Sequence, residues 1–593
     1  MKNIKEFLNN KNVQWILSTI IFLTSLFIFT FVLCNIYKSR NNELNPKTDG
    51  ETTSININGT TVTNESGNTV ATIIDEETGE EVTVVIDSDT GEVLRTTTNP
   101  ETGEVITKVI TTKPTVPKTE PTTKLRMNVD KIVNNIDELK ESNLSVGKTI
   151  HTNGYYSAND GGEGYYRVEA KSNQVIDNGK YILLNNGLVA SLIPIDNTYN
   201  VKQFGAKGDS KTDDTESLKR ALKAVSGYTV YFPKGTYMLS NYISIYSNTK
   251  IIGDGEESLI MAVDEIGVEK TLLSISEMEK IEISDIAVSG NIEHNTREMG
   301  HSDQRGIHLL DIGNSTNITI TNCIFKDNVY AAVRMIKNAS NMTFKNNKFL
   351  NVDCGVASMG KGEVNDILVD SNYFDGHYAS EPITMFGTGT YKNLIFNNNI
   401  MKNKTIGSGV YIGFAGARTY GAKITNNKIY DCAGGINIKY ADDVLVENNY
   451  LNFSDLDLQV GGGLGIRLIE SSNAKVLNNK IVNAGQFAIR NESGTNILYK
   501  GNVVENGARS NKDFTFVDFF GTNNNVVFEE NKISRLDSTL TPNLLSVSGD
   551  GGVTIKNNQF ENGKIWLRST SANIIVSGNN VEVRDQGTNN IIN

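Results

Sequence analysis

Side chains able to move protons gather in one stretch of the sequence, residues 290–308. This stretch holds three of the five histidines of the chain, together with Asp303 and Arg305. An imidazole such as that of His308 could take the proton next to a uronate carboxylate while a guanidinium binds that carboxylate, which is the chemistry of a polysaccharide lyase. Two carboxylates on either side of a glycosidic bond could instead hydrolyse it. Both reactions stay open, and the candidate catalytic residues are His308, Asp303, Asp353 and Glu381.

A second set of candidates recurs at a fixed place in short apolar runs. An inward apolar residue of each run is followed by one that must point outward, because side chains alternate along a strand. If the runs stack about 4.8 Å apart, the outward residues form one file. Arginine pairs with carboxylates and tyrosine stacks on sugar rings, so the file would suit an anionic polysaccharide, although a surface row without a partner stays open. The file reads His308, Arg334, Ala357, Thr384, Tyr411, Asn437, Arg467, Arg490 and Asp518, and the candidate substrate-binding residues are Arg305, Arg334, Tyr411, Asn437, Arg467 and Arg490.

The elements that would position these residues repeat with a period of about 26 residues, which is typical of a solenoid. Each repeat carries an asparagine after a short β run, where the side chain suits a bend and can bond from turn to turn. The pattern predicts an all-β fold, a single-stranded right-handed parallel β-helix over residues 201–593. The asparagines expected at this bend are Asn322, Asn347, Asn372, Asn398, Asn427, Asn449, Asn479, Asn502, Asn531, Asn558 and Asn579.

The start of the repeats carries a recognisable segment. Residues 201–215 read VKQFGAKGDSKTDDT, in which Asp213 and Asp214 would cap a helix that buries Leu218, Ala221 and Leu222 over the open end of the solenoid. The segment resembles the entry signature of the pectate-lyase-3 (glycoside hydrolase 28-related) β-helix family, and residues 147–168 resemble the small β module of phage tailspike-like proteins. The resemblance implies a carbohydrate-active β-helix. The motifs of polygalacturonases are matched only formally, at Asn351–Asp353, so their site residues are not carried over.

The part before residue 201 is divided by composition. Residues 1–11 are expected to form a short cytoplasmic tail, and 12–37, which hold no charged residue, a transmembrane helix. Residues 38–124 form a Thr- and Pro-rich stalk in which Thr-Gly-Glu turns begin at Thr78, Thr90 and Thr102; hairpins and disorder both stay open. Residues 125–200 hold a short helix, with apolar residues from Leu125 to Leu139, and the small β module. The bulk of the chain would face the outside of the cell membrane.

Charge and cysteine content exclude several functions. The net charge of −12 and pI near 5.2 argue against nucleic acid as a partner. The four cysteines have no metal-binding spacing, so no metal site is predicted; no cofactor is certain, and Ca²⁺ stays open. The expected partners are a polysaccharide and, through one helix, a membrane, with a homotrimer left open. The expected function is lyase or hydrolase action on a polysaccharide, or else non-catalytic glycan binding and adhesion.

Overall fold

The computed structural model describes residues 127–593 except 268–269, 296–306, 377–379, 403–406, 415, 457, 459–461 and 512, together with strands between residues 62 and 110. The chain divides into two compact units, up to Leu125 and from Arg126. No helix among these described residues is long and apolar enough to cross a membrane. The predicted transmembrane helix, residues 12–37, and the cytoplasmic tail lie outside the described residues.

The described strands of the first unit form an antiparallel sheet in the order β1-β2-β3-β4-β5. The three predicted Thr-Gly-Glu turns fall in the connections β2–β3, β3–β4 and β4–β5, and each connects strands that pair with each other. The 12-residue repeat is therefore a series of hairpins. The strands are β1 (Val62–Thr63), β2 (Thr69–Ile74), β3 (Glu81–Ile86), β4 (Val93–Thr98) and β5 (Val105–Ile110).

The second unit begins with a small sheet in the order β6-β7-β8-β10-β9. The helix expected from Leu125 onward is shorter than predicted, because Lys131–Val133 forms β6, which pairs with β7 and leaves Ile132 63% exposed. Between residue 127 and Lys140, the helical part is α3 (Ile136–Lys140). It begins where the side chain of Asn135 accepts a hydrogen bond from the backbone of Glu138. The strands are β6 (Lys131–Val133), β7 (Thr149–Thr152), β8 (Gly164–Glu169), β9 (Tyr181–Leu183) and β10 (Val189–Ile193).

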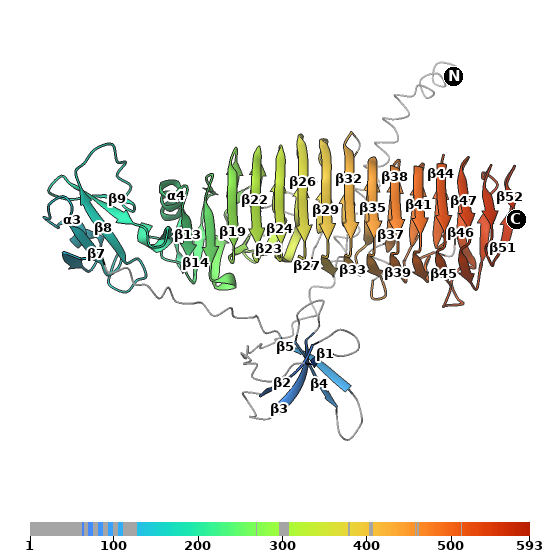
Figure 1. Cartoon of the computed structure of the whole chain (residues 1–593), viewed down its shortest axis with the longest axis horizontal. Helices are drawn as coiled ribbons and strands as arrows, with labels where there is room; N and C mark the ends of the chain where they lie inside the picture. Colours follow the sequence, from blue (N-terminus) through green and yellow to red (C-terminus); the bar gives the residue numbers. More distant parts are fainter. Residues whose placement is uncertain are drawn as a thin grey trace, which may run out of the picture. The chain divides into compact units, whose positions relative to one another are not determined.

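Helix α4 (Thr215–Ala224) lies at the first turns of the solenoid, as the sequence predicts (Figure 1). It buries Leu218, Ala221 and Leu222. Asp213 accepts from the first backbone N–H of the helix at 3.0 Å, whereas Asp214 accepts from the backbone of Lys207 and Gly208 instead. These two carboxylates are thus occupied with backbone donors. The 3₁₀ helices η1 (Val201–Phe204) and η2 (Gly255–Glu257) lie on either side of α4 in sequence.

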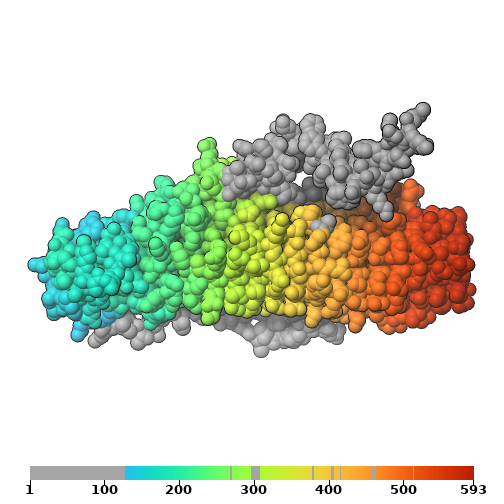
Figure 2. All heavy atoms as spheres, turned by 90° about the horizontal axis from the view of Figure 1, so that it is seen from above, coloured from blue at the N-terminus to red at the C-terminus, as the bar shows by residue number. Residues whose placement is uncertain are grey.

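The rest of the second unit is a parallel β-solenoid whose turns succeed one another along its long axis (Figure 2). Each complete turn contributes three strands, and the inward side chains of all three faces form one shared core. The first-strand face is one parallel sheet. Its strands are β11 (Thr198–Asn200), β13 (Thr229–Phe232), β16 (Lys250–Gly253), β19 (Glu279–Ser284), β22 (Ser315–Thr321), β24 (Ala339–Lys345), β26 (Glu363–Asp370), β29 (Thr390–Asn397), β32 (Arg418–Thr425), β35 (Ala441–Glu447), β38 (Ser472–Leu477), β41 (Thr495–Lys500), β44 (Asn524–Glu529), β47 (Val553–Lys556), β50 (Ile575–Ser577) and β52 (Ile591–Ile592).

The second and third faces are joined through β23 (Ile324–Met335) and β25 (Lys348–Ser358), which each run across both. The second-strand face holds β12 (Asp209–Asp213), β14 (Gly235–Leu239), β17 (Ser258–Ala262), β20 (Ala287–Ser289), β27 (Tyr373–Asp375), β30 (Ile400–Lys402), β33 (Lys428–Tyr430), β36 (Tyr450–Asn452), β39 (Lys480–Val482), β42 (Val503–Glu505), β45 (Lys532–Ser534) and β48 (Gln559–Glu561). The third-strand face holds β15 (Ile243–Ser244), β18 (Thr271–Ser276), β21 (His308–Gly313), β28 (Ile383–Met385), β31 (Ser408–Ile412), β34 (Gly434–Lys439), β37 (Leu464–Ile469), β40 (Ile489–Glu492), β43 (Val517–Phe520), β46 (Asn543–Ser548), β49 (Lys564–Leu567) and β51 (Glu582–Asp585).

The predicted asparagine ladder is present, with two positions corrected by one residue. Each buried ladder residue presents its side-chain oxygen to the backbone and side-chain amides of the turn before; for Asn347 and Asn372 both distances are 2.9–3.0 Å. Cys323 and Asn399 occupy the slots predicted for Asn322 and Asn398. The left-handed geometry falls one residue earlier, where Asn398 has φ 57°. The left-handed bend and the ladder of hydrogen bonds, which the sequence assigns to one asparagine, therefore belong to successive residues.

Replacing one ladder asparagine is expected to lower stability. In Asn427→Ala, the backbone N–H and the side-chain amide of Asn399 both lose the oxygen to which they donate. Buried donors left without acceptors cost about 1–3 kcal/mol each, so the unfolding midpoint should fall by several degrees. Asn241→Ala, at an exposed asparagine, is the control. Equal midpoints for the two variants in thermal melts would contradict the stabilising role of the ladder.

Candidate functional site

The outward file predicted from the sequence lies on the third-strand face and is called the column below. Backbone pairing confirms its register from Arg334 to Asp518. The first member is wrong, because Arg334 pairs with Asp311 and His308 pairs with Thr271. The extra residues before β21 shift the alignment by three positions, which the apolar pattern around Ile307 did not reveal. The column reads Asp311, Arg334, Ala357, Thr384, Tyr411, Asn437, Arg467, Arg490 and Asp518, and it continues to Ser546, Trp566 and Arg584.

His308 is a buried residue, not an outward member of the column. Its side chain is packed against Tyr330 with ring centroids 4.4 Å apart, and the residue is only 2% exposed. Burial, and secondarily the charge of Arg334, lowers the pKa of His308 to about 3. The imidazole therefore stays neutral at ordinary pH. It is also shielded from the solvent from which a glycan would approach.

The other residues predicted near His308 are paired, buried or outside the described part of the chain. Asp311 binds Arg334 through two bonds of 2.9 and 2.8 Å and accepts a third from Thr271, so the guanidinium of Arg334 is occupied. Asp353 is buried in β25. Asp303 and Arg305 lie outside the described residues, as do His301 and His377.

The middle of the column brings a lysine, a tyrosine and an arginine together. Lys439 lies two residues after Asn437 in β34, so both side chains face outward, and its ammonium is 5.1 Å from the centroid of the Tyr411 ring. Burial, and then the neighbouring Arg467 charge, lowers the pKa of Lys439. Burial and the nearby carboxylate of Glu381 raise the pKa of Tyr411 to about 12. A lysine whose neutral form is favoured by its surroundings and a phenol that stays protonated are thus neighbours.

Two polar atoms on the same stretch of the column lack partners among the described residues. The side-chain oxygen of Asn437 is buried without a hydrogen bond, and so is the hydroxyl of Thr384. Glu381, just before β28, accepts a hydrogen bond from Ser380 at 3.0 Å. Buried polar atoms without partners are uncommon and often belong to functional sites. Thr384 and Asn437 lie on the two turns that neighbour Tyr411.

Further along, two arginines of the column share one carboxylate. Glu492 lies 2.7 Å from both Arg467 and Arg490. The Nε atom of Arg490, which is the atom close to Glu492, also lies 3.6 Å from Asp518. These are ion-pair distances, but the Nε–H group makes no hydrogen bond. Burial raises the pKa of Asp518, which accepts a hydrogen bond of 2.6 Å from Ser546. Two carboxylates in different environments therefore meet around one arginine.

Several long connections of the solenoid join the second strand of a turn to the third strand, the strand that carries the column. The 290–307 insertion joins β20 to β21, and the 376–382 connection, which carries Glu381, joins β27 to β28. Residues 453–463 and 506–516 make the same kind of connection further on. Loops over a rigid scaffold commonly carry binding and catalytic residues. This arrangement favours the column over the other faces as the functional surface.

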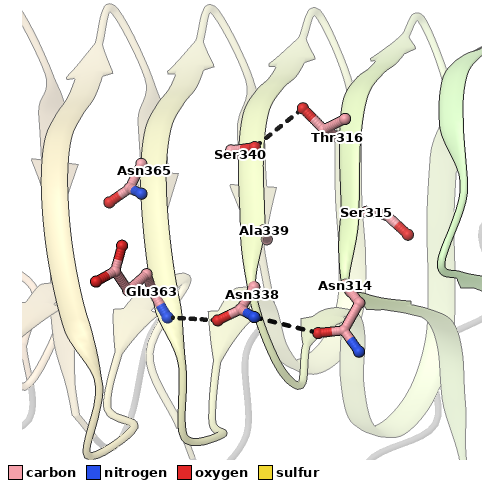
Figure 3. A pocket seen from close by; sticks show the side chains of 8 residues that line it. All are labelled: Asn314, Ser315, Thr316, Asn338, Ala339, Ser340, Glu363 and Asn365. Atoms are coloured by element: carbon pink, nitrogen blue, oxygen red, sulfur yellow. Dashed lines mark hydrogen bonds between the residues drawn. The ribbon is translucent and has the colours of Figure 1, made fainter.

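A shallow hollow of about 430 Å³ lies on the first-strand face instead, at the starts of β22, β24 and β26 (Figure 3). Its wall residues bond to one another: Ser340 donates to Thr316, and Asn338 donates to Asn314. Glu363 is the charged residue of its wall, so the hollow would repel an anionic glycan. Within the described part of the chain, no group of three His, Cys, Asp or Glu residues is placed to hold a metal ion.

The fold and the column together define a right-handed parallel β-helix, and comparisons with known proteins agree. Residues 387–533 and 417–581 match the family described as right handed beta helix region. Residues 198–454 match the family described as rhamnogalacturonase A/epimerase, pectate lyase-like. The resemblance predicted from residues 201–215 is thereby confirmed.

Individual relatives cover shorter stretches. The chain is 38% identical to alginate lyase 7 of Azotobacter vinelandii over 118 residues, which is 17% of this chain and 14% of that protein. It is 32% identical to the preneck appendage protein of Bacillus phage PZA over 136 residues, 22% of this chain and 14% of the relative. Among solved structures, the tailspike protein gp49 from Acinetobacter baumannii bacteriophage Fri1, a capsular polysaccharide depolymerase, has a TM-score of 0.42 at 13% identity, covering 72% of this chain and 75% of that one.

Proposed function

We propose that the chain is a polysaccharide lyase that binds an anionic glycan along the column and cleaves it at Tyr411, Lys439 and Arg467. One observation carries the proposal: the ammonium of Lys439 lies over the Tyr411 ring, at a place where burial and Arg467 lower its pKa. A base, a proton donor and a cation for the substrate carboxylate are thus available together. The similarity to alginate lyase 7 and to the pectate lyase-like family supports the choice of a polyuronate as substrate.

The proposed reaction is a β-elimination. The neutral amine of Lys439 takes the proton from the carbon next to the uronate carboxylate. The electron pair of that C–H bond forms a carbon–carbon double bond, and the bond to the glycosidic oxygen on the adjacent carbon breaks. Tyr411 donates its phenolic proton to the leaving oxygen. The guanidinium of Arg467 binds the carboxylate and stabilises the negative charge that develops there.

The pKa shifts favour these roles over the reverse assignment. A base must be deprotonated, and a lowered pKa increases the neutral fraction of Lys439 at any given pH. A proton donor must be protonated, and Tyr411, with a pKa of about 12, stays so up to alkaline pH. His308, proposed from the sequence as the base, lacks access to the solvent. The rate should therefore rise with pH as Lys439 loses its proton.

The test is to incubate the full-length protein with alginate, pectate and uronate-containing capsular polysaccharides. Elimination produces an unsaturated uronate at each new chain end, which absorbs ultraviolet light, whereas hydrolysis produces only a new reducing end. Unsaturated product from one of these polymers is the expected result. Binding without any product would overturn the lyase proposal and favour the adhesion alternative.

A specific observation also supports hydrolysis as a second candidate. Glu492 lies between two guanidinium groups, while burial raises the pKa of Asp518. Acid–base hydrolysis requires a carboxyl group that stays protonated together with a second carboxylate. The nearest oxygens of Glu492 and Asp518 lie 2.7 and 3.6 Å, respectively, from the same nitrogen of Arg490. Reducing ends without unsaturated products would favour this pair.

Asp518→Asn separates the two candidates. If Lys439 is the base, this variant should keep the rate of product formation within a few-fold of wild type, because Asp518 lies two turns beyond Arg467 on the column and takes no part in elimination. If Asp518 is a general acid, the rate should fall about 10²–10⁴-fold. Product release measured on the polymer identified above distinguishes these outcomes. The thermal melt of Asp518→Asn serves as the control for folding.

We also propose that the second unit is displayed on the outside of a cell membrane by the segment 12–37. The absence of charge in that segment and the hairpin repeat that follows it support this location. Protease treatment of intact cells should remove the β-helix from the cell surface. Deleting residues 1–37 should release the protein from the membrane fraction, and retention in that fraction would contradict the proposal.

A further inference from the structure

Two arginines lie against one tryptophan on the last described turns of the column. The guanidinium carbon of Arg568 is 4.5 Å from the centroid of the Trp566 ring, and that of Arg584 is 5.5 Å from it. Trp566 and Arg584 are successive members of the column, on β49 and β51, and Arg568 lies directly after β49. Arg584 is exposed, whereas Trp566 and Arg568 are partly buried. These three residues are called the arginine–tryptophan cluster.

The indole of Trp566 positions the two guanidiniums. Its ring N–H donates to the side-chain oxygen of Gln586 at 2.8 Å, which fixes the orientation of the ring. A guanidinium packed over an aromatic ring keeps its planar N–H donors directed away from its own edge, where a carboxylate can accept two of them. With two cations packed against it, the indole supports guanidiniums instead of stacking on a sugar ring. The chemistry of the cluster is therefore that of an anion-binding site.

The positive charges of the cluster are not neutralised by carboxylates of the described residues. Within the described part of the chain, the arginines that form ion pairs are Arg334, Arg467 and Arg490. Arg568 and Arg584 belong to none of these pairs. Asp585, next to Arg584, instead accepts hydrogen bonds from the loop that follows it. Two cations held side by side without counter-charges attract an anionic ligand.

The cluster continues the cationic surface of the column. Burial raises the pKa of Asp518, whereas the charges of Arg490 and Arg568 act in the opposite direction, so both guanidiniums lie near this carboxyl group. Tyr411 precedes Trp566 by six steps of the column, which is about 29 Å at about 4.8 Å per turn. A uronate unit of an extended glycan is about as long as one turn is high. One chain of roughly six sugars therefore spans the distance.

We propose that Arg568 and Arg584, positioned by Trp566, form a distal subsite for the carboxylate of a sugar roughly six units from the bond cleaved at Tyr411. The inference rests on the proposed function, because one polyuronate chain would bind at both places on the column. A long chain reaches both places, whereas a short oligomer reaches only one. The second contact of a long chain is intramolecular, so it adds affinity without a second association step. The distal subsite would therefore select substrates by chain length.

The test compares size-separated oligomers of alginate and of polygalacturonate, as tetramers and as chains of about twelve sugars, long enough to span about six turns. Affinity of the full-length protein for each oligomer is measured by calorimetry. For the polymer that binds, R568Q/R584Q should lose about tenfold in affinity for the long chain, since two partly exposed charge pairs contribute that much. Its affinity for the tetramer should stay within about twofold of wild type, because a tetramer bound at Lys439 and Arg467 is too short to reach the cluster.

R418Q/K423Q is the matched control, because it also removes two positive charges, but from exposed residues of β32 on the first-strand face. It should keep the wild-type affinity for the long chain. The conservative variant R568K/R584K keeps both charges and replaces the planar donors, so it should lose most of the same affinity. Full retention of affinity in R568K/R584K would show a diffuse attraction between charges and overturn the distal subsite.

The remaining outcomes separate the distal subsite from the proposed function. Wild-type affinity for the long chain in R568Q/R584Q would overturn the subsite and leave the proposed function intact. An equal loss for both lengths would show a general effect of charge or folding, and it would also overturn the subsite. No wild-type binding to either polymer at either length would overturn the proposed polyuronate substrate and the distal subsite together.

Discussion

Replacing Lys439 with methionine is expected to lower the rate of unsaturated product formation by about 10²–10⁴-fold, the usual contribution of a general base. Methionine keeps the length of the side chain and its contact with the Tyr411 ring but cannot accept a proton. Affinity for the polymer should change little, because Arg467 and Arg490 remain on the column. Initial rates under saturating polymer, with affinity measured separately, provide the test.

Lys402→Met is the matched control for this prediction. Lys402 also lies over a tyrosine ring, with its ammonium 5.3 Å from the centroid of Tyr373, but on the second-strand face. It should retain the wild-type rate. A Lys439→Met protein that melts like wild type and still forms product at the wild-type rate would remove Lys439 from the reaction. Equal losses in both variants would indicate a general effect of charge on polymer binding.

The fold was predictable because its main constraints repeat along the chain. One inward residue and one bend residue recur in every turn, so errors at single positions do not change the period. The slots assigned to Asn322 and Asn398 were each one residue early, because two consecutive asparagines or an Asn-Cys pair leave the choice open. The column from Arg334 to Asp518 was found for the same reason: neighbouring turns fix the register of each other.

The candidate catalytic residues were harder to predict, because their chemistry depends on burial and on neighbours from other turns. Lys439 could have been noticed, since it follows the outward Asn437 by two residues in one strand. Nothing local, however, indicates that Arg467 of the next turn would lower its pKa. His308 misled in the opposite way: histidine attracts attention in a sequence, yet here it is packed against Tyr330. The insertion before β21 interrupts the repeat directly before His308, so the neighbouring turns did not fix the register of this residue.

Arg467→Gln should change the pH dependence of the reaction as well as its rate. The Arg467 guanidinium lowers the pKa of Lys439, so its removal should raise that pKa toward the ordinary value of lysine. Glu492, which also acts to raise the pKa of Lys439, would lose one of its two arginine partners, and this effect has the same sign. The neutral fraction of Lys439 at a given pH should therefore fall. The rising limb of the pH–rate profile should move to higher pH.

The loss of a carboxylate-binding group should also lower the rate about 10²-fold at any fixed pH, the typical effect of removing one donor that stabilises a developing charge. Arg490→Gln separates the two effects, because Arg490 contacts the same Glu492 but lies one turn further from Lys439 on the column. It should move the limb to higher pH by much less, because it acts on Lys439 only through the partner that Glu492 loses. A limb that stays in place in Arg467→Gln, or moves to lower pH, would mean that a group other than Lys439 accepts the proton. Because both variants remove one positive charge from the same face and one arginine partner of Glu492, a larger shift in Arg467→Gln arises from its proximity to the base.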